Sequence, residues 1–549
     1  MHEDEEAKRE QPRPCVRAFS PDAHRIESLH GTWILWLPWG HSPSGAVSLL
    51  KTRGKPHDLA KKLCSVYPEI TGTFTPREAT CASLAFRSLS SGFELFCLRD
   101  AEDRPVLTDF YRDAVSLLPR GERRLGLSGI ADYLLSLCPI DHQTYVPAIT
   151  RVPNGALWEW PFGEAAPTRL VVESLADLLG EEPHPSVEEA LDRAMEPLRG
   201  NPGLALLFSG GVDSSLLASY LGPLTEALVA LAPPAELWSE REIARQGAQL
   251  LGLSRTREIP FSDERFIENM TETVRHAGIP VPFPNYQGLF QESMFRTEHA
   301  AYCTGDMADS LFGYRDVESG HDEPDVWEEM KDRLFPEGGL LRELGTMGLF
   351  SGGRAALELV GPDVVSGRLR DRHAYLLDRT GNLNRLPPSF DLKAEWGHIA
   401  FVLGQPYWRH HYRQQAIALG KSLLCPYAQR DILRAAWALP IGDRSPAGAP
   451  LKLVLRNILK ARVPGFPVNL PKGGNGVPRT RYCTTGPLAE FFEERPIPSA
   501  LSPEVLPILK NPVWETSGAI LNLATLSVWE ASCLKAHNPP SGPPKLAVL

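Results

Sequence analysis

The sequence predicts an α/β fold in which a β-rich first domain precedes a doubly wound parallel sheet. Between about residues 25 and 195, short apolar runs such as GTWILWLPWG and CASLAF alternate with turn residues, which is typical of a strand-rich domain. After residue 203, strand-length apolar runs alternate with helix-like segments, and this alternation favours parallel strands joined by crossover helices.

The elements follow in a regular order. A helix is predicted at 127–138, and the segment 180–202 indicates a linker and a helix, so we place the domain boundary there. The strands of the second domain are predicted at 204–208, 227–232, 255–261 and 300–304. Its helices are predicted at 214–221, at 239–253 with a Ser239–Glu242 capping box, and from a Ser262 cap toward Gly278. Beyond about residue 330 the pattern is mostly helical.

A chain of 549 residues is too long for one ordinary core, so two large domains are expected. An acidic, polar beginning and a tail rich in proline and glycine suggest disordered ends. The predicted organisation is a disordered N-terminus, a first domain, a second domain and a disordered tail, over residues 1–24, 25–195, 200–537 and 538–549.

Composition excludes several classes of protein. The net charge of −10 argues against a broad surface for nucleic acid or an anionic membrane. No run approaches the roughly 20 apolar residues that a membrane helix needs, and the N-terminal stretch lacks the apolar region of a signal peptide. Nine scattered cysteines without a CxxC pair indicate reduced thiols. We therefore expect a cytoplasmic protein.

The stretch LALLFSGGVDSSLLASYL at 204–221 predicts an anion site. Glycines between a strand and a helix let the backbone approach a phosphate, and the unpaired N–H groups and dipole of the helix favour negative charge. Asp213 would repel a phosphate unless Mg²⁺ lay between them, so the motif predicts a nucleotide plus Mg²⁺. It is not a GxxxxGK[ST] loop. The candidate nucleotide ligands are Ser209, Gly210, Gly211, Asp213, Ser214 and Ser215.

A second block, YCTGDMADSLFGY at 302–314, ends another predicted strand of the same sheet. Because the carboxyl ends of parallel strands meet at one edge, Asp309 can join Asp213 in bracketing one Mg²⁺. Gly305 in this block is a further candidate nucleotide contact.

A third series follows, with LLCPYAQRDILRAAWALP at 423–440, LKLVLRNIL at 451–459 and VNLPKGGNG at 468–476. The three blocks, in this order, resemble the asparagine synthetase superfamily, which includes asparagine synthetase, β-lactam synthetase and the lasso-peptide cyclases. The resemblance implies the fold of the adenine nucleotide alpha hydrolases and an ATP pyrophosphatase loop at SGGVDS. The family's C-terminal places are filled by Pro426, Tyr427, Lys452, Leu455, Arg456 and Lys472.

The resemblance also implies two catalytic residues. Lys472 fills the place of the lysine in the family's mobile loop, where its ammonium would stabilise the charge that develops on the phosphates. Asp306 stands where the family has glutamate and would accept a proton from the attacking amine. Two departures, Leu424 for arginine and Gln429 for aspartate, put recognition of aspartate in doubt.

The first domain resembles the end of a glutaminase domain over residues 126–160. Glutaminases of this N-terminal-nucleophile type use a cysteine that follows the initiator Met, but this chain has His2 there, and its nearest thiol is Cys15. The domain is therefore expected to be a degenerate glutaminase scaffold. The nitrogen donor would then be free ammonia or an amine on the substrate.

The expected function is an ATP-dependent, AMP-forming amide ligase that adenylates a carboxylate of a small molecule or peptide for attack by ammonia or an amine. Asparagine synthesis and peptide or natural-product cyclisation, as in the lasso-peptide cyclases, are both open, and so is a nucleotide-binding scaffold without turnover. The YWRHHYR segment at 407–413 has no acid partner nearby in sequence and is expected to be surface or packing.

Overall fold

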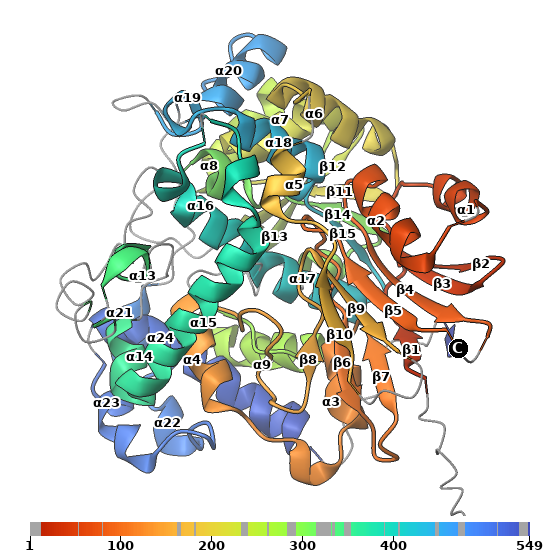
Figure 1. The fold of residues 1–549 in the computed structure, drawn as a ribbon. Coiled ribbons are helices and arrows are strands. Elements are labelled where there is room, and N and C mark those ends of the chain that lie inside the picture. Colours follow the sequence, from red (N-terminus) through yellow and green to blue (C-terminus); the bar gives the residue numbers. More distant parts are fainter. Residues whose placement is uncertain are drawn as a thin grey trace, which may run out of the picture.

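The computed structural model describes residues 13–548 except 53, 79–80, 162–165, 181–182, 232–239, 261–262, 283–292, 314–330, 332–334, 337, 345–352, 389, 405–406, 445–449, 470–477, 513 and 537–546. Figure 1 shows antiparallel strands of the first domain, in red and orange, beside a parallel sheet surrounded by helices. In the described part of the chain, none of the helices has the length and apolarity needed to cross a bilayer.

Two sheets form the first domain, which confirms that it is β-rich. The six-stranded sheet has the order β10 (Thr168–Val171), β9 (Ala156–Trp160), β5 (Ser83–Arg87), β4 (Thr71–Pro76), β3 (Gly31–Trp36) and β2 (Ala23–Glu27), all antiparallel. The five-stranded sheet has the order β16 (Ala547–Val548), β1 (Cys15–Ala18), β7 (Pro105–Thr108), β6 (Phe96–Arg99) and β8 (Thr150–Arg151).

Apolar residues from both sheets meet in one core. Trp36 and Trp158 of the six-stranded sheet pack with Val16 and Leu107 of the five-stranded sheet. Two helices, α1 (Ser44–Leu50) and α2 (Pro56–Val66), cover the outer face of the six-stranded sheet. Period-two alternation therefore gives each strand one face for the shared core and one for a helical layer.

The predicted disorder at the two ends of the chain differs from what the structure shows. Cys15–Ala18 forms β1, and Ala547–Val548 pairs with it in antiparallel register, while Ala23 begins β2. Composition misled the prediction, because short strands at a sheet edge take their stability from backbone pairing with neighbours rather than from a long apolar run. The segment 537–546 between them lies outside the described residues.

The second domain contains the predicted parallel sheet. Its order is β13 (Arg255–Pro260), β12 (Glu226–Leu231), β11 (Leu204–Leu207), β14 (Ala301–Cys303) and β15 (Ser422–Leu424), with every pair parallel. Leu204 and Leu206 pack into the core on one face, whereas Ala205 and Leu207 face the core on the other. Both faces are covered, as doubly wound sheets require.

Helices supply both covering layers. One core contains side chains of α7 (Val212–Leu221), α8 (Glu240–Leu250), α11 (Ala308–Phe312), α16 (Leu392–Gly404), α18 (Arg430–Ala438) and α20 (Leu453–Arg462). The opposite core contains side chains of α3 (Tyr111–Leu117), α4 (Leu127–Ser136), α9 (Phe266–Ala277), α14 (Gly353–Val360), α17 (Tyr407–Ala418) and α24 (Trp514–Trp529). The other α-helices among the described residues are α5 (Leu175–Leu179), α6 (Val187–Met195), α13 (Gly339–Leu344), α15 (Pro362–Thr380), α19 (Ile441–Arg444), α21 (Arg479–Thr484), α22 (Phe491–Glu494) and α23 (Leu506–Lys510).

These helices agree with the sequence patterns. The predicted helices at 127–138, 214–221 and 239–253 correspond to α4, α7 and α8. Helix α9 ends at Gly278, which has a φ of +67° and forms the left-handed C-cap that glycine favours. Ser239 and Ser262, the predicted caps, lie outside the described residues.

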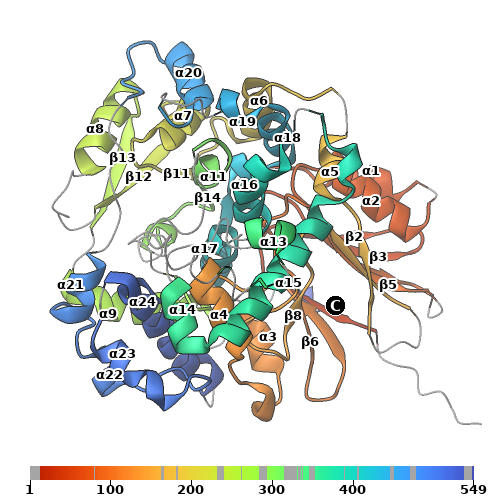
Figure 2. The same cartoon turned by 60° about the vertical axis from the view of Figure 1, so that its left-hand side comes forward.

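Helix α17 contains the whole YWRHHYR segment and lies at the centre of the molecule in both views (Figures 1 and 2). His411 Nε2 lies 3.0 Å from the Leu137 carbonyl oxygen, and Arg413 pairs with Glu69 at 2.9 Å. The Gln414 side chain bonds the backbone of 109–111. These side chains are buried, so residues 411–414 pack between the two domains, which is one of the two roles expected for the segment.

Asp109 holds the beginning of the first domain against β3. Its Oδ1 accepts a hydrogen bond from the Phe19 amide at 2.8 Å, and its Oδ2 accepts bonds from the Ser20 amide at 2.8 Å and from Trp36 Nε1 at 2.7 Å. Burial raises the pKa of this carboxyl to about 6, although the three donors oppose that shift. Asp109 therefore acts as an acceptor on both oxygens.

Replacing Asp109 by asparagine should destabilise the protein by about 2–3 kcal/mol, because the new amide N–H₂ would face an N–H donor that is left buried and unpaired. The midpoint of urea unfolding, followed by tryptophan fluorescence, would measure this change. Asp103→Asn is the matched control, since Asp103 is exposed and its φ of +58° suits asparagine. Equal midpoints for the two variants would contradict this role of Asp109.

Candidate active site

The predicted site residues lie at the point where the chain changes the side of the parallel sheet on which it adds strands. From β11 the chain builds outward through β12 to β13, then returns to add β14 and β15 on the other side of β11. Loops at the carboxyl ends of β11 and β14 therefore diverge, and in such sheets the crevice between diverging loops is the usual ligand site. Figure 2 shows β11, β14, α7 and α11 at this place.

The glycine loop after β11 is shaped by a neighbouring helix. Gly210 has a φ of +74°, and a Cβ there would lie 2.6 Å from the Ala244 Cα and the Ile243 carbonyl oxygen of α8. Only glycine satisfies both conditions. Gly211 is the N-cap of α7 and has an extended backbone, so the helix begins directly after the turn. The N-terminus of this ten-residue helix faces the crevice side of the sheet.

Serine hydroxyls fix the loop against the helix. Ser214 Oγ accepts a hydrogen bond from the Ser209 amide at 3.2 Å and donates one to the Gly211 carbonyl oxygen at 3.3 Å. The Gly211 amide donates to Ser209 Oγ at 3.3 Å. Ser215 is fully buried, and its Oγ has no hydrogen-bond partner among the described residues. The serines therefore shape the turn, while Ser209 stays exposed at its rim.

The two predicted acids converge on one cation. Lys452 Nζ contacts Asp213 Oδ2 and lies 2.8 Å from Asp309 Oδ1. Asp213 belongs to the first turn of α7 and Asp309 to the first turn of α11, so each follows a different strand of the sheet. Gly305 permits this approach, because a Cβ there would lie 3.1 Å from the Asp213 Cβ. The sequence prediction that these acids share a cation position is consistent with this geometry.

Lys452 is held at this place by its backbone. It is the N-cap of α20, with a φ of +60°, and its amide donates to the Phe312 carbonyl oxygen at 3.0 Å. Burial alone would lower the pKa of Lys452, but the charges of Asp213 and Asp309 outweigh burial and hold the pKa above its usual value. The ammonium is therefore charged at any physiological pH.

Asp306 lies in the turn between β14 and α11. Its Oδ2 accepts a hydrogen bond from Thr304 Oγ1 at 2.8 Å, and its carbonyl oxygen accepts one from Cys425 Sγ at 3.2 Å. The following residue, Met307, has a φ of +74°, an uncommon conformation for a side chain of this size. Such a strained turn is typical of a functional loop.

Most of the predicted residues therefore meet at one edge of the sheet, since the 209–215 loop, Gly305 and Asp309 are in contact or in the same turns. Lys472 lies outside the described residues.

The sequence analysis named Lys452 only as a family match and missed its pairing with both acids. The Lys-x-x-Leu-Arg spacing at the start of α20 was the available signal. Tyr427, another match, donates from its hydroxyl to the Asp213 carbonyl oxygen at 3.1 Å.

The first departure from the family pattern lies in the core. Leu424 is the last residue of β15 and packs with the apolar side chains beneath α7. Gln429 is buried and is the N-cap of α18, though its side chain makes no capping hydrogen bond.

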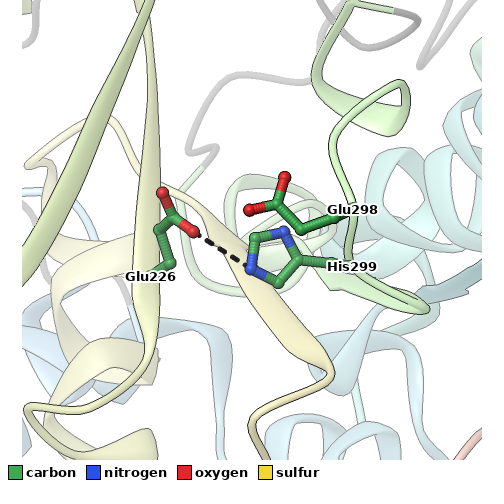
Figure 3. Close-up of side chains that lie close together, drawn as sticks. All are labelled: Glu226, Glu298 and His299. Atoms are coloured by element: carbon green, nitrogen blue, oxygen red, sulfur yellow. Dashed lines mark ion pairs between the residues drawn. The ribbon is translucent and has the colours of Figure 1, made fainter.

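A second cluster of possible metal ligands lies elsewhere in the sheet. Glu226, Glu298 and His299 place one ligand atom each within 4.8 Å of the others, and His299 Nε2 lies 3.1 Å from Glu226 (Figure 3). Glu226 begins β12, so the cluster is at the amino ends of the strands, opposite the glycine loop. Arg257 donates to both carboxylates at 2.6–3.3 Å, which offsets part of their negative charge. We interpret this cluster as a structural ion-pair network.

The donor set of Asp213 and Asp309 fits Mg²⁺, because both carboxylates already share one cation and oxygen ligands are those that Mg²⁺ prefers.

A scan against models of protein families matches residues 186–382 to the family described as asparagine synthase. A search of curated proteins gave no match. The matched segment includes the glycine loop, Gly305, Asp306 and Asp309, so residues 186–382 of this chain are a domain of the asparagine synthetase superfamily of ATP-dependent, amide-forming ligases.

Proposed function

We propose that this chain activates a substrate carboxylate by transferring AMP to it from ATP, and then joins the activated acyl group to an amine or ammonia. The observation that carries the proposal is the convergence of Asp213 and Asp309 on one cation position beside the N-terminus of α7. A site for nucleotide phosphates needs both features, a helix N-terminus for the anion and carboxylates for the metal.

The chain's own groups would act as follows. The amides that begin α7 and the exposed Ser209 hydroxyl would bind phosphate oxygens. Asp213 and Asp309 would hold Mg²⁺, which neutralises phosphate charge when bound. Lys472 would stabilise the charge on the departing pyrophosphate, as the resemblance to the family implies.

Activation is required because a carboxylate is a poor acyl donor at neutral pH. A carboxylate oxygen would attack the α-phosphorus of ATP, the bond between the α- and β-phosphates would break, and pyrophosphate would leave. The amine would then attack the acyl carbon of the acyl-adenylate and release AMP. Asp306 would accept the proton that the amine loses, and its bond to Thr304 orients the carboxylate for this task.

The first domain bears on the nitrogen donor. Cys15 is the first residue of β1, and its backbone nitrogen is in a peptide bond to Pro14, so this thiol has no free α-amine beside it. This supports a degenerate glutaminase scaffold, with ammonia or a substrate amine as the nucleophile. An amine on the same substrate would make the reaction a cyclisation, and we keep peptide cyclisation as the second candidate. The nine free thiols support the proposed cytoplasmic location.

The test is release of AMP and pyrophosphate from Mg-ATP with aspartate and ammonia supplied and glutamine absent. Release that depends on aspartate and yields asparagine would establish asparagine synthesis. Release that depends instead on a peptide carrying both a carboxylate and an amine, with loss of one water from its mass, would establish cyclisation. ATP binding without AMP release under any of these conditions would overturn the ligase proposal in favour of a nucleotide-binding scaffold.

A further inference from the structure

We propose that Lys452 is a resident counter-ion of the acid pair, which Mg²⁺ must displace before it can bind. This inference rests on the proposed function, since it concerns the same two carboxylates. It adds that the chain alone holds divalent metal weakly and that tight binding needs the nucleotide. The lysine would thereby make metal and nucleotide bind together.

The contacts show that the ammonium takes the place that a bridging metal would need. Lys452 Nζ contacts one oxygen of Asp213 and lies 2.8 Å from one oxygen of Asp309. The side chain of Lys452 is 8 % exposed, against 21 % and 36 % for the two acids. The lysine therefore lies beneath the carboxylates, and the acids retain a solvent-facing side through which a metal can approach.

Ammonium and Mg²⁺ cannot both occupy this position. Mg²⁺ requires oxygen ligands at about 2.0–2.1 Å in a near-ideal octahedron, which a cation already bonded to the same two oxygens prevents. Two positive ions at such a distance also repel each other in a partly buried site, where screening by water is weak. One cation must leave before the other binds.

The side chain can move without the backbone. The Lys452 amide is bonded to the carbonyl oxygen of Phe312, the last residue of the short helix that carries Asp309. The backbone of Lys452 therefore keeps its position relative to Asp309, while the flexible four-carbon side chain lets the ammonium move. A bound nucleotide would supply the anionic oxygens that the displaced ammonium needs, which explains why exchange would require the nucleotide.

Arg456 limits where the ammonium can go. It lies one helical turn after Lys452, and burial lowers its pKa, although the nearby charge of Asp213 opposes that shift. Its Nε donates to the Leu451 carbonyl oxygen at 2.6 Å, and its buried Nη1 has no hydrogen-bond partner among the described residues. A second cation thus flanks the acids on the α20 side, so the displaced ammonium would move away from it, toward the phosphates.

The experiment measures binding of Mn²⁺ alone, as a probe for Mg²⁺, by electron paramagnetic resonance of free Mn²⁺ without nucleotide. Lys452→Met removes the charge and keeps an unbranched side chain, and it should bind Mn²⁺ at least tenfold more tightly than the wild type. Lys452→Arg keeps the charge and should stay within about twofold of the wild type. Mn²⁺ affinity in Lys452→Met that equals or falls below that of the wild type would overturn the proposal.

Two further variants keep the test decisive. Adding Asp309→Asn to Lys452→Met should abolish the gain in Mn²⁺ affinity, and a gain that survives would locate the metal elsewhere and overturn the assignment. Lys452→Gln serves if the methionine variant does not fold, with the same expected gain. AMP release by the wild type tests the proposed function separately. If the wild type released no AMP but Lys452→Met still bound Mn²⁺ more tightly, the proposed function would be overturned, while the displacement of Lys452 by metal would still hold.

Discussion

Asp309→Asn is expected to lower AMP release on the order of 10³-fold at saturating Mg-ATP, the largest loss of activity that we predict for any single substitution. Asparagine keeps the size of the side chain and one oxygen, but it removes the negative charge that a divalent cation needs. Among the described residues, Asp309 supplies one of the two carboxylates on the shared cation, so the remaining charge on Asp213 would already be matched by Lys452. The variant should therefore hold its nucleotide without activating it.

The measurement is a coupled assay of AMP and pyrophosphate, with the substrates that support turnover in the wild type. Asp363→Asn is the matched control, because Asp363 also lies in the first turn of a helix, α15, but is exposed. Unfolding midpoints of both variants should lie close to that of the wild type. Wild-type AMP release by Asp309→Asn would remove this residue from the metal site.

The parallel sheet was predictable because its signals are local. Strands β11, β12 and β14 are short apolar runs, and β11 is buried on both faces, whereas β13 at the sheet edge is partly exposed. The chain between these strands has the length of a helix. The glycine loop was equally clear, because a strand that enters two glycines and then a helix allows few conformations. Strand β15 was not predicted, since a three-residue run gives no periodicity.

The pairing of Lys452 with the acids could not be predicted from physical pattern alone. Lys452 and Asp213 are 239 residues apart, and nothing in the local sequence of either shows which partner the fold brings to it. The order of motifs placed Lys452 in the family's C-terminal series, but only the coordinates show its contact with both carboxylates. A lone lysine near a helix start is otherwise typical of a solvated surface.

The sequence left open whether the segment in α17 is surface or packing, for a related reason. Its polar residues have a surface composition, yet His410, His411, Arg413 and Gln414 are buried because the first domain supplies partners for them. Those partners come from loops and helices more than 250 residues earlier in the chain. Polar patterning therefore fails where two domains close around one helix.

Arg413→Met should be among the most destabilising substitutions in the chain, at about 3–5 kcal/mol, because it leaves the Glu69 carboxylate buried without its partner. The two side chains are 3 % and 2 % exposed, and they lie 2.9 Å apart. Arg413 also lies 3.9 Å from the centroid of the Phe93 ring, so the substitution removes a cation–π contact as well. The midpoint of urea unfolding at pH 8 would measure the loss.

The pH dependence of that loss identifies its origin. Burial raises the pKa of Asp22 to about 6, and the charge of Arg413 opposes that rise, so the pKa of Asp22 should be higher still in Arg413→Met. A carboxyl whose folded pKa exceeds its unfolded value binds a proton more readily when folded, so its contribution to stability falls as pH rises from about 4 through its folded pKa. The variant should therefore lie closer to the wild type at pH 5 than at pH 8. Glu69→Gln added to Arg413→Met should recover part of the lost stability at pH 8, because the uncompensated charge is then gone. A loss of stability that is the same at both pH values, and that Glu69→Gln does not relieve, would show that α17 is held by its packing and not by this ion pair.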